Sequence, residues 1–268
     1  MRRAEVTLQT LRLLRRSILW WSIGLAGLVV LLLAVYPSIR DNPAMKQMLS
    51  EYPEVLREFV SFGGAFDYIS PAGYLGAELF SLMAPLLFII AGITAGARAI
   101  AGEEEDGTLD LVLSMPVSRT SVLLQKALAV LVELVILAVV LVVVLWIGTA
   151  VVGMDIGVQY LAAGALDLVL LAMVFAMLAL LLGAATGRRA LSAGIAGAVA
   201  VLLYFVNGLA PLVDALDAIR PTSPFFQYAA SDALHAGLSA THALILVAIS
   251  VVLVAVAPIV LSRRDVRV

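Results

Sequence analysis

The sequence contains no cysteine, only two histidines, and only 13% charged residues among its 268. The absence of cysteine excludes a disulfide framework and any thiolate site. His235 and His242 lie at or beyond the edge of an apolar run, so they cannot supply the ligands that an intramembrane metalloprotease projects from its spans. A Gly-x-Ser-x-Gly elbow and a Gly-x-x-x-x-Gly-Lys phosphate loop are also lacking. We therefore expect no enzyme activity, no metal site and no cofactor bound by this chain, and its net charge of −2 gives no reason to expect a nucleic acid partner.

Apolar residues are abundant, at 63% of the chain with a mean hydropathy of +1.08. A soluble domain of this length could not bury so much apolar surface, so the fold class is an all-α integral membrane protein. Six runs are long enough to cross a hydrocarbon core of about 30 Å. The first run is as long as a full span and no small-residue cleavage site follows it, so we expect a retained span rather than a signal peptide. The predicted spans are 17–36, 79–97, 127–152, 160–186, 190–212 and 242–261, within one domain over residues 1–268.

The basic residues are distributed unevenly over the ends of these spans. Arg40, Lys46, Arg57 and Arg220 occupy one set of ends, and the other 13 of the 17 basic residues occupy the opposite set. Because lysine and arginine accumulate on the cytoplasmic side of a membrane, both termini and the connection 102–119 are predicted to be cytoplasmic. The 13 residues are Arg2, Arg3, Arg12, Arg15, Arg16, Arg98, Arg119, Lys126, Arg188, Arg189, Arg263, Arg264 and Arg267.

The connection 102–119 reads GEEEDGTLDLVLSMPVSR and joins the second span to the third. It opens with four acids, Glu103, Glu104, Glu105 and Asp106. Gly107 can end the arriving helix in the left-handed conformation, Thr108 can begin a new one, Pro116 can end it, and Ser118 can cap the third span. The short helix between them would carry Leu109, Val112 and Leu113 on one face. Either a soluble partner covers this face, or the helix lies on the lipid surface.

The N-terminal and external segments also carry patterns. Residues 2–16 interleave arginine with apolar residues, and Leu11, Leu14 and Ile18 form a partial apolar face, which fits an interfacial helix or a simple positive anchor. The first external loop, 37–74, is predicted to be a solvated cap rather than a capture site, with a helical stretch possible at 54–62. The second, 213–241, is predicted to re-enter the bilayer edge or to form an aromatic belt, with a short helix possible at 230–236. The residues that suggest re-entry are Pro224, Phe225, Phe226 and Tyr228.

Two acids lie within predicted spans, where charges are candidates for function. Glu133 and Asp167 each lie roughly 10 Å deep, in opposite leaflets, at a rise of 1.5 Å per residue. Arg98 and Lys126 are the candidate partners of Glu133, for which a structural ion pair is the expected role. Asp167 has no evident basic partner and is expected to lie near enough to the external surface to contact water.

Residues 97–126, ARAIAGEEEDGTLDLVLSMPVSRTSVLLQK, resemble the signature of type-2 ABC exporter permeases. That signature is an acidic pair or triplet, Gly-Thr, an alternating leucine stretch, Pro-Val-Ser-Arg and a lysine that opens the third span. The six-span layout matches across nearly the whole chain, and SPFFQYAASDAL at 223–234 resembles the segment before the family's last span. A long first external loop is typical of only part of the family, in subunits similar to antibiotic- and sodium-export permeases.

The resemblance implies a permease subunit of an ATP-driven exporter in a prokaryotic inner or plasma membrane. Residues 108–115 would form the coupling helix, which docks on a separate ABC ATPase subunit that binds ATP and Mg. Two permease copies, a homodimer in the simplest case, would enclose the transport path and bind two ATPase copies. The residues implied in coupling are Glu103, Glu104, Glu105, Asp106, Gly107, Thr108, Leu109, Val112, Leu113, Pro116 and Arg119.

Other functions stay open at this point. The chain could be an ATP-independent channel or secondary transporter in which Glu133 and Asp167 couple ions, or a membrane scaffold or sensor that transports nothing. Co-purification of an ATPase would separate the first reading from the other two. The transported substrate does not follow from the resemblance, because the family handles drugs, peptides, ions, polysaccharides and lipids with similar sequences.

Overall fold

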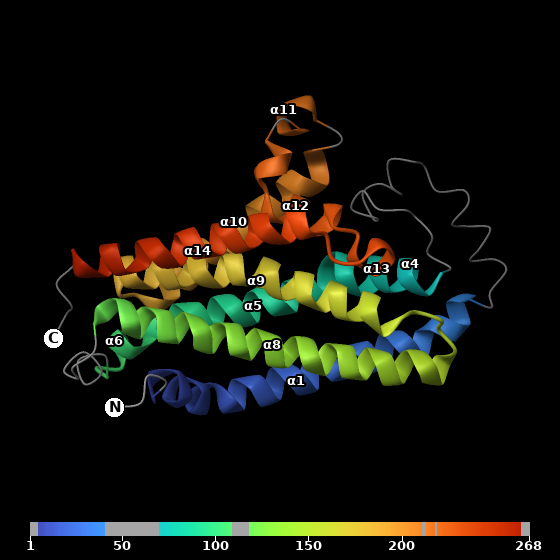
Figure 1. Cartoon of the computed structure of the whole chain (residues 1–268), viewed down its shortest axis with the longest axis horizontal. Helices are drawn as coiled ribbons and strands as arrows, with labels where there is room; N and C mark the ends of the chain where they lie inside the picture. The colour runs from blue at the N-terminus through green and yellow to red at the C-terminus, as the bar shows by residue number, and fades with distance from the viewer. Residues whose placement is uncertain (1–4, 41–69, 109–117, 211–212, 218, 264–268) are drawn as a thin grey trace.

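The computed structural model describes residues 5–40, 70–108, 118–210, 213–217 and 219–263. These residues form an elongated bundle of long helices lying side by side, with no strand among them (Figure 1). Six helical stretches are long and apolar enough to cross a membrane. This confirms the all-α membrane fold. The two termini and the end of the second span lie at the same end of the bundle.

The described helices extend the predicted spans at most of their ends. The first, third, fourth, fifth and sixth spans are α1 (Glu5–Arg40), α8 (Arg119–Val152), α9 (Val158–Thr186), α10 (Arg189–Leu209) and α14 (Ala240–Ser262). The second span is built from α4 (Pro71–Leu75), η1 (Gly76–Met83), α5 (Ala84–Ala97), η2 (Arg98–Gly102) and α6 (Glu103–Glu105), of which η1 and η2 are π-helical. Between α10 and α14 lie α11 (Asp214–Asp217), η4 (Arg220–Thr222), α12 (Pro224–Ala230) and α13 (Ala233–Ala236).

The core of the bundle is the contact between α5 and α9. In the most apolar 18 residues of the second span (Pro71–Glu105), 61% of the stretch is buried, and in those of α9 the share is 67%. The corresponding share is 17% in α1 and 22% in α10 and in α14. Small residues let the two central helices approach closely, since a Cβ at Gly96 would overlap the carbonyl of Ala176. The outer helices expose large apolar side chains such as Trp20, Leu202 and Val252, as expected of surfaces that contact lipid.

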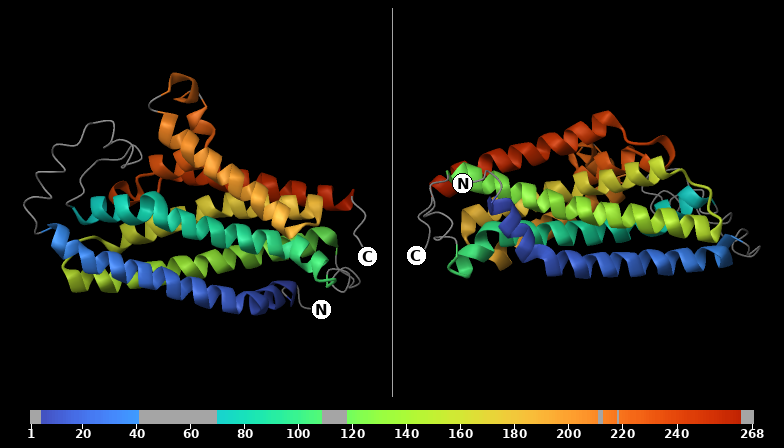
Figure 2. Two further views of the ribbon diagram at one scale, coloured as in Figure 1. Left: turned by 180° about the vertical axis from the view of Figure 1, so that it is seen from behind. Right: turned by 60° about the horizontal axis from the view of Figure 1, so that its bottom comes forward.

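The N-terminal region differs from its prediction. The expected interfacial helix and first span form one continuous helix, α1, whose first turns are set at an angle to the rest (Figure 2). Its buried face is also different, because Thr7, Thr10 and Leu14 are buried whereas Leu11 and Ile18 are only partly so. The predicted apolar face is kept in part, since Leu14 belongs to the core and Ile18 packs against it, but the buried side of the helix extends to Thr7 and Thr10. The reason is that this part of α1 packs on polar groups of α8.

The ends of the helices agree with the predictions from local sequence better than the N-terminal region does. The Ser118 hydroxyl accepts a hydrogen bond of 3.2 Å from the backbone N–H of Ser121 and so caps α8, as predicted. Gly187 ends α9 in the left-handed conformation, with φ 63°, and so makes the tight turn before α10. The helix expected at 230–236 is instead divided into α12 and α13 by Asp232, whose φ is 45°. The helical stretch suggested at 54–62 lies outside the described residues.

Candidate functional site

The candidate site is the end of the second span, where the acidic motif leaves the bundle. Gly107 has φ 67°, its N–H donates to the carbonyl of Glu104, and the N–H of Thr108 donates to the carbonyl of Glu103. This paired pattern is a Schellman ending, which satisfies carbonyls that a helix terminus would leave open. It confirms that Gly107 stops the helix. The Thr108 hydroxyl also bonds back to the Glu103 carbonyl, at 3.2 Å.

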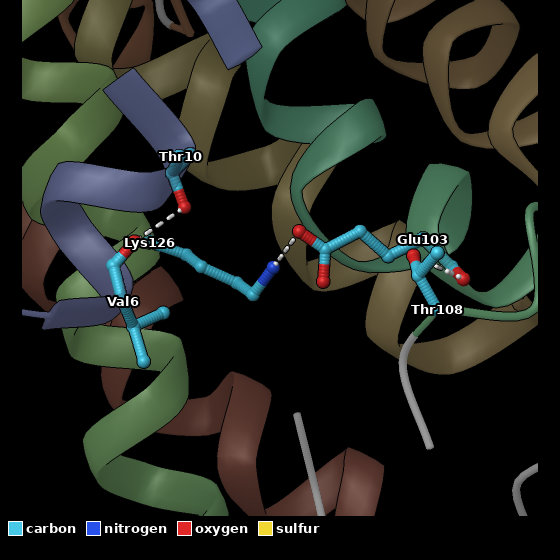
Figure 3. Close-up of polar contacts among 5 residues, drawn as sticks. All are labelled: Val6, Thr10, Glu103, Thr108 and Lys126. Atoms are coloured by element: carbon cyan, nitrogen blue, oxygen red, sulfur yellow. Dashed lines mark hydrogen bonds and ion pairs between the residues drawn. The ribbon is translucent and has the colours of Figure 1, made fainter. Parts of the chain in front are cut away.

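Glu103 and Lys126 form an ion pair that links this motif to the third span (Figure 3). The Nζ of Lys126 lies 2.5 Å from Oε1 of Glu103, with the Lys126 side chain fully buried and that of Glu103 16% exposed. A charge at that depth is costly unless it is paired. Lys126 is thus held by the first acid of the motif.

Two further contacts anchor the flanks of the connection. Oε1 of Glu105 accepts a hydrogen bond of 2.9 Å from the backbone N–H of Arg189, at the start of α10. On the other side of the connection, the Arg119 guanidinium donates a hydrogen bond of 3.1 Å to the carbonyl of Leu261 in the last turn of α14. The described residues on both sides of segment 109–117 are therefore tied to neighbouring spans.

The first helix closes over the buried lysine. The Thr7 hydroxyl donates a hydrogen bond of 3.1 Å to the carbonyl of Gln125, one residue before Lys126. Val6 and Thr10 lie beside the Lys126 side chain, and the Thr10 hydroxyl is bonded to the Val6 carbonyl at 2.8 Å (Figure 3). Three chain segments therefore meet at Lys126: the start of α1, the acidic motif and the start of α8.

The predicted coupling face itself is not part of this geometry. Leu109, Val112, Leu113 and Pro116 lie outside the described residues. Of the remaining acids, Glu104 is half-buried, whereas Asp106 is exposed at the end of the bundle. The structure thus shows how both ends of the connection are held, whereas the contacts of its apolar face stay a prediction.

Glu133 has a different partner from the one predicted. Among the described residues it forms an ion pair with neither Arg98 nor Lys126, because Lys126 points toward Glu103 instead. The Ser17 hydroxyl of α1 donates to Oε1 of Glu133 at 3.3 Å, and Oε2 has no hydrogen-bond partner among the described residues. The carboxylate is 1% exposed. Glu133 therefore belongs to the contact between α1 and α8. Thr7, Ser17, Lys126 and Glu133 form a line of polar groups along this contact, which we call the polar seam.

Asp167 is buried rather than wet, contrary to expectation. Its exposed fraction is 0%, and neither carboxylate oxygen has a hydrogen bond of ordinary geometry within the described part of the chain. Ser231 and Tyr228, from the segment between the fifth and sixth spans, lie beside it.

The segment that carries Tyr228 packs far along the bundle. The Phe225 ring lies 5.5 Å from that of Phe175 and 5.4 Å from that of Tyr204, between centroids. Phe175 follows the start of α9 by 17 residues, which is about 26 Å at 1.5 Å per residue. Tyr228 donates a hydrogen bond of 2.7 Å to the carbonyl of Phe80. The Arg220 guanidinium lies over the Phe226 ring, which also contacts the His242 ring edge-on. Re-entry of this segment into the bilayer stays a prediction.

Sequence reasoning missed Thr7, Thr10 and Ser17, which face α8. These residues recur at helical spacing with Leu14 on one face of α1, and that spacing was the available signal. It was hidden because leucines at neighbouring positions form a competing apolar pattern. Lys126, one of the two candidate partners of Glu133, pairs with Glu103 instead.

One known family matches the chain over nearly all of its length. The family model described as ABC-2 family transporter protein matches residues 11–266, nearly the whole chain. A search of curated proteins finds no match. The family match and the six apolar helices together establish that the chain belongs to the ABC-2 transporter family, as a multi-pass, non-catalytic permease subunit of an ABC transporter.

Proposed function

We propose that this permease works as an exporter subunit driven by a separate ABC ATPase, which docks on the connection between the second and third spans. The observation that carries the proposal is the anchoring of this connection on both sides, by Glu103 and Glu105 before it and by Arg119 after it. A segment that transmits force from a partner has to be fixed to the spans it moves. In the proposal residues 108–115 form the coupling helix, and Leu109, Val112 and Leu113 contact the ATPase.

The orientation of the chain follows from its charges. Basic residues lie in the first turns of α1 (Arg12 and Arg15), at the start of η2 (Arg98) and in the turn before α10 (Arg188), which supports a cytoplasmic location for both termini in a prokaryotic inner membrane. An ATPase that uses cytoplasmic ATP and Mg would meet the connection on that side. In this proposal the permease itself binds no nucleotide.

The transport path is proposed to form between two copies of the chain, a homodimer in the simplest arrangement, with one ATPase bound to each. The weakly buried outer helices support this arrangement, since α10 and α14 leave large surfaces for lipid and for a second copy. The segment α12–α13, with Pro224, Phe225, Phe226 and Tyr228, would close the external end of the path.

The test is purification of the full-length tagged chain in mild detergent from its native membranes. The proposal predicts that an ATPase remains bound and that the complex hydrolyses ATP in a vanadate-sensitive manner. A permease that retains no ATPase under several mild detergents, and in lipid nanodiscs, would contradict it. Chemical crosslinking in membranes before extraction controls for loss of the partner during purification.

One observation favours a second candidate function. Glu133 and Asp167 are buried acids with few hydrogen-bond partners, and such groups also serve in ion-coupled transport. In that case the chain would act as a channel or secondary transporter without ATP. Proteoliposomes that contain the permease alone, with an imposed proton or sodium gradient and a matching fluorescent indicator, test this directly. Gradient-driven flux that Glu133→Gln or Asp167→Asn abolishes would favour the second function over the first.

A further inference from the structure

Besides the contact of Glu105 with α10, the acidic motif is connected to the second and third spans in two different ways. Along the chain, α6 follows α5 through η2 (Arg98–Gly102), where the backbone is π-helical. A π-helical stretch interrupts the regular hydrogen-bond ladder and is a place where helices bend. Across the bundle, α6 is joined to α8 by the pair of Glu103 and Lys126. The covalent connection is thus irregular, whereas the lateral connection is a buried ion pair.

The second span has little freedom to transmit a displacement itself. Gly92 and Gly96 of α5 lie against Ala172 and Ala176 of α9 so closely that even a methyl group at Gly96 would overlap backbone. Closely packed helices resist sliding past one another, because a close-packed protein interior has few voids into which side chains could move. A displacement of the acidic motif is therefore expected to pass sideways to α8 through the pair of Glu103 and Lys126.

The third span, by contrast, is joined to its neighbour by contacts that would move with it. The Thr7 hydroxyl bonds to the Gln125 carbonyl, and the Ser17 hydroxyl bonds to Glu133 two turns further along α8. Both contacts run along the same side of α8 as Lys126, so α1 and α8 share one polar seam. A force applied at Lys126 would act on the two helices together.

We propose that Lys126 is a positioning residue that transmits movement of the acidic motif, through Glu103, to α8 and α1 as a unit. The inference rests on the proposed docking of an ATPase at the same connection. Its role depends on charge complementarity with Glu103 rather than on the volume of the side chain. A reversed pair should therefore transmit movement, and a neutral side chain at either position should not.

The experiment uses the absence of cysteine in the natural sequence. Cysteines replace Val151 at the end of α8, which is 79% exposed, and Leu82 in η1, which is 45% exposed. Spin labels at these positions report the α8-to-η1 distance by pulsed electron resonance, in the full-length complex with its ATPase, with and without Mg-ATP and vanadate. Labelled chains are diluted with unlabelled ones, so that distances within one chain dominate. The variants are Lys126→Gln, Glu103→Gln and the reversed pair, Glu103→Lys with Lys126→Glu, and Asp155→Asn is the charge-matched control.

The expected result is a nucleotide-dependent shift of the distance distribution in the parent and in Asp155→Asn. The shift is lost in both neutral variants while the ATPase remains bound and active, and it returns in the reversed pair. A full shift in the neutral variants, no shift in the parent complex, or no return in a folded reversed pair would overturn the proposal. If the neutral variants do not fold, the reversed pair still decides it. Failure of the ATPase to bind the parent would contradict the proposed function instead.

Discussion

The hydroxyl of Ser17 in the first span donates a hydrogen bond to the carboxylate of Glu133 in the third, at 3.3 Å. The two residues meet because α1 and α8 run in parallel, so that Thr7 is level with Gln125 and Ser17 is level with Glu133. The acid is almost wholly buried, at 1% exposure. In this account its role is to fix the register of the two helices.

The first prediction concerns that contact. Ser17→Ala should lower the free energy of unfolding by about 1.5–3 kcal/mol, the usual contribution of a hydrogen bond to a charged group. In a Glu133→Gln background the same change should cost less, because the acceptor carries no charge. Thermal unfolding in detergent of the four chains of this double-mutant cycle measures the difference. Equal costs in both backgrounds would show that the two side chains do not interact.

The second prediction is an asymmetry in the pair of Lys126 and Glu103. Breaking a buried ion pair costs about 3–5 kcal/mol, because one charge is left without a partner. Glu103→Gln leaves the fully buried Lys126 alone, whereas Lys126→Met leaves Glu103, whose side chain is 16% exposed and can hydrate. Glu103→Gln should therefore lower the unfolding temperature more than Lys126→Met does. The double variant should recover most of the loss, and the reverse order of the two single variants would contradict the geometry.

The third prediction concerns packing between the central helices. Gly96→Ala should destabilise the protein by about 1–3 kcal/mol, as overpacking of an interior does, because the added methyl group overlaps the Ala176 carbonyl. Gly194→Ala is the matched control, since a Cβ there meets nothing within 4 Å. The control should be neutral or slightly stabilising, because alanine favours a helix. Unfolding of both variants under identical detergent conditions makes the comparison, and equal stability would argue against the close α5–α9 contact.

The fourth prediction is the membrane topology. Cysteines that replace Asp155 and Thr222, both exposed near external connections, should react with an impermeant thiol reagent in intact cells or spheroplasts. A cysteine that replaces Arg188, in the exposed turn before α10, should react only after lysis. Ser223 is a poor reporter although it is next to Thr222, because it is 1% exposed. Reaction of position 188 from outside would reverse the proposed orientation.

The sequence predicts the parts of this fold that depend on local residues. Gly107 and Ser118 end and begin helices because each acts through its own conformation or hydroxyl, and the six spans follow from apolar length alone. The partner of Lys126 could not be predicted, because Glu103 and Glu133 both lie within reach of a flexible side chain. The choice depends on how α1 and α6 pack around α8. The burial of Asp167 likewise depends on a segment that is distant in sequence.

The central claim is that one face of the connection 109–117 contacts an ATPase. Single cysteines at Leu109, Val112 and Leu113, and at Asp110, Leu111 and Ser114 as the opposite face, can be treated in native membranes with a photoreactive thiol crosslinker. The account predicts crosslinks to the ATPase from the first three positions and few from the other three. A lipid-soluble photoreactive reagent that labels the first three positions, with no crosslink to an ATPase at any of the six, would show that this helix lies on the membrane surface and would contradict the account.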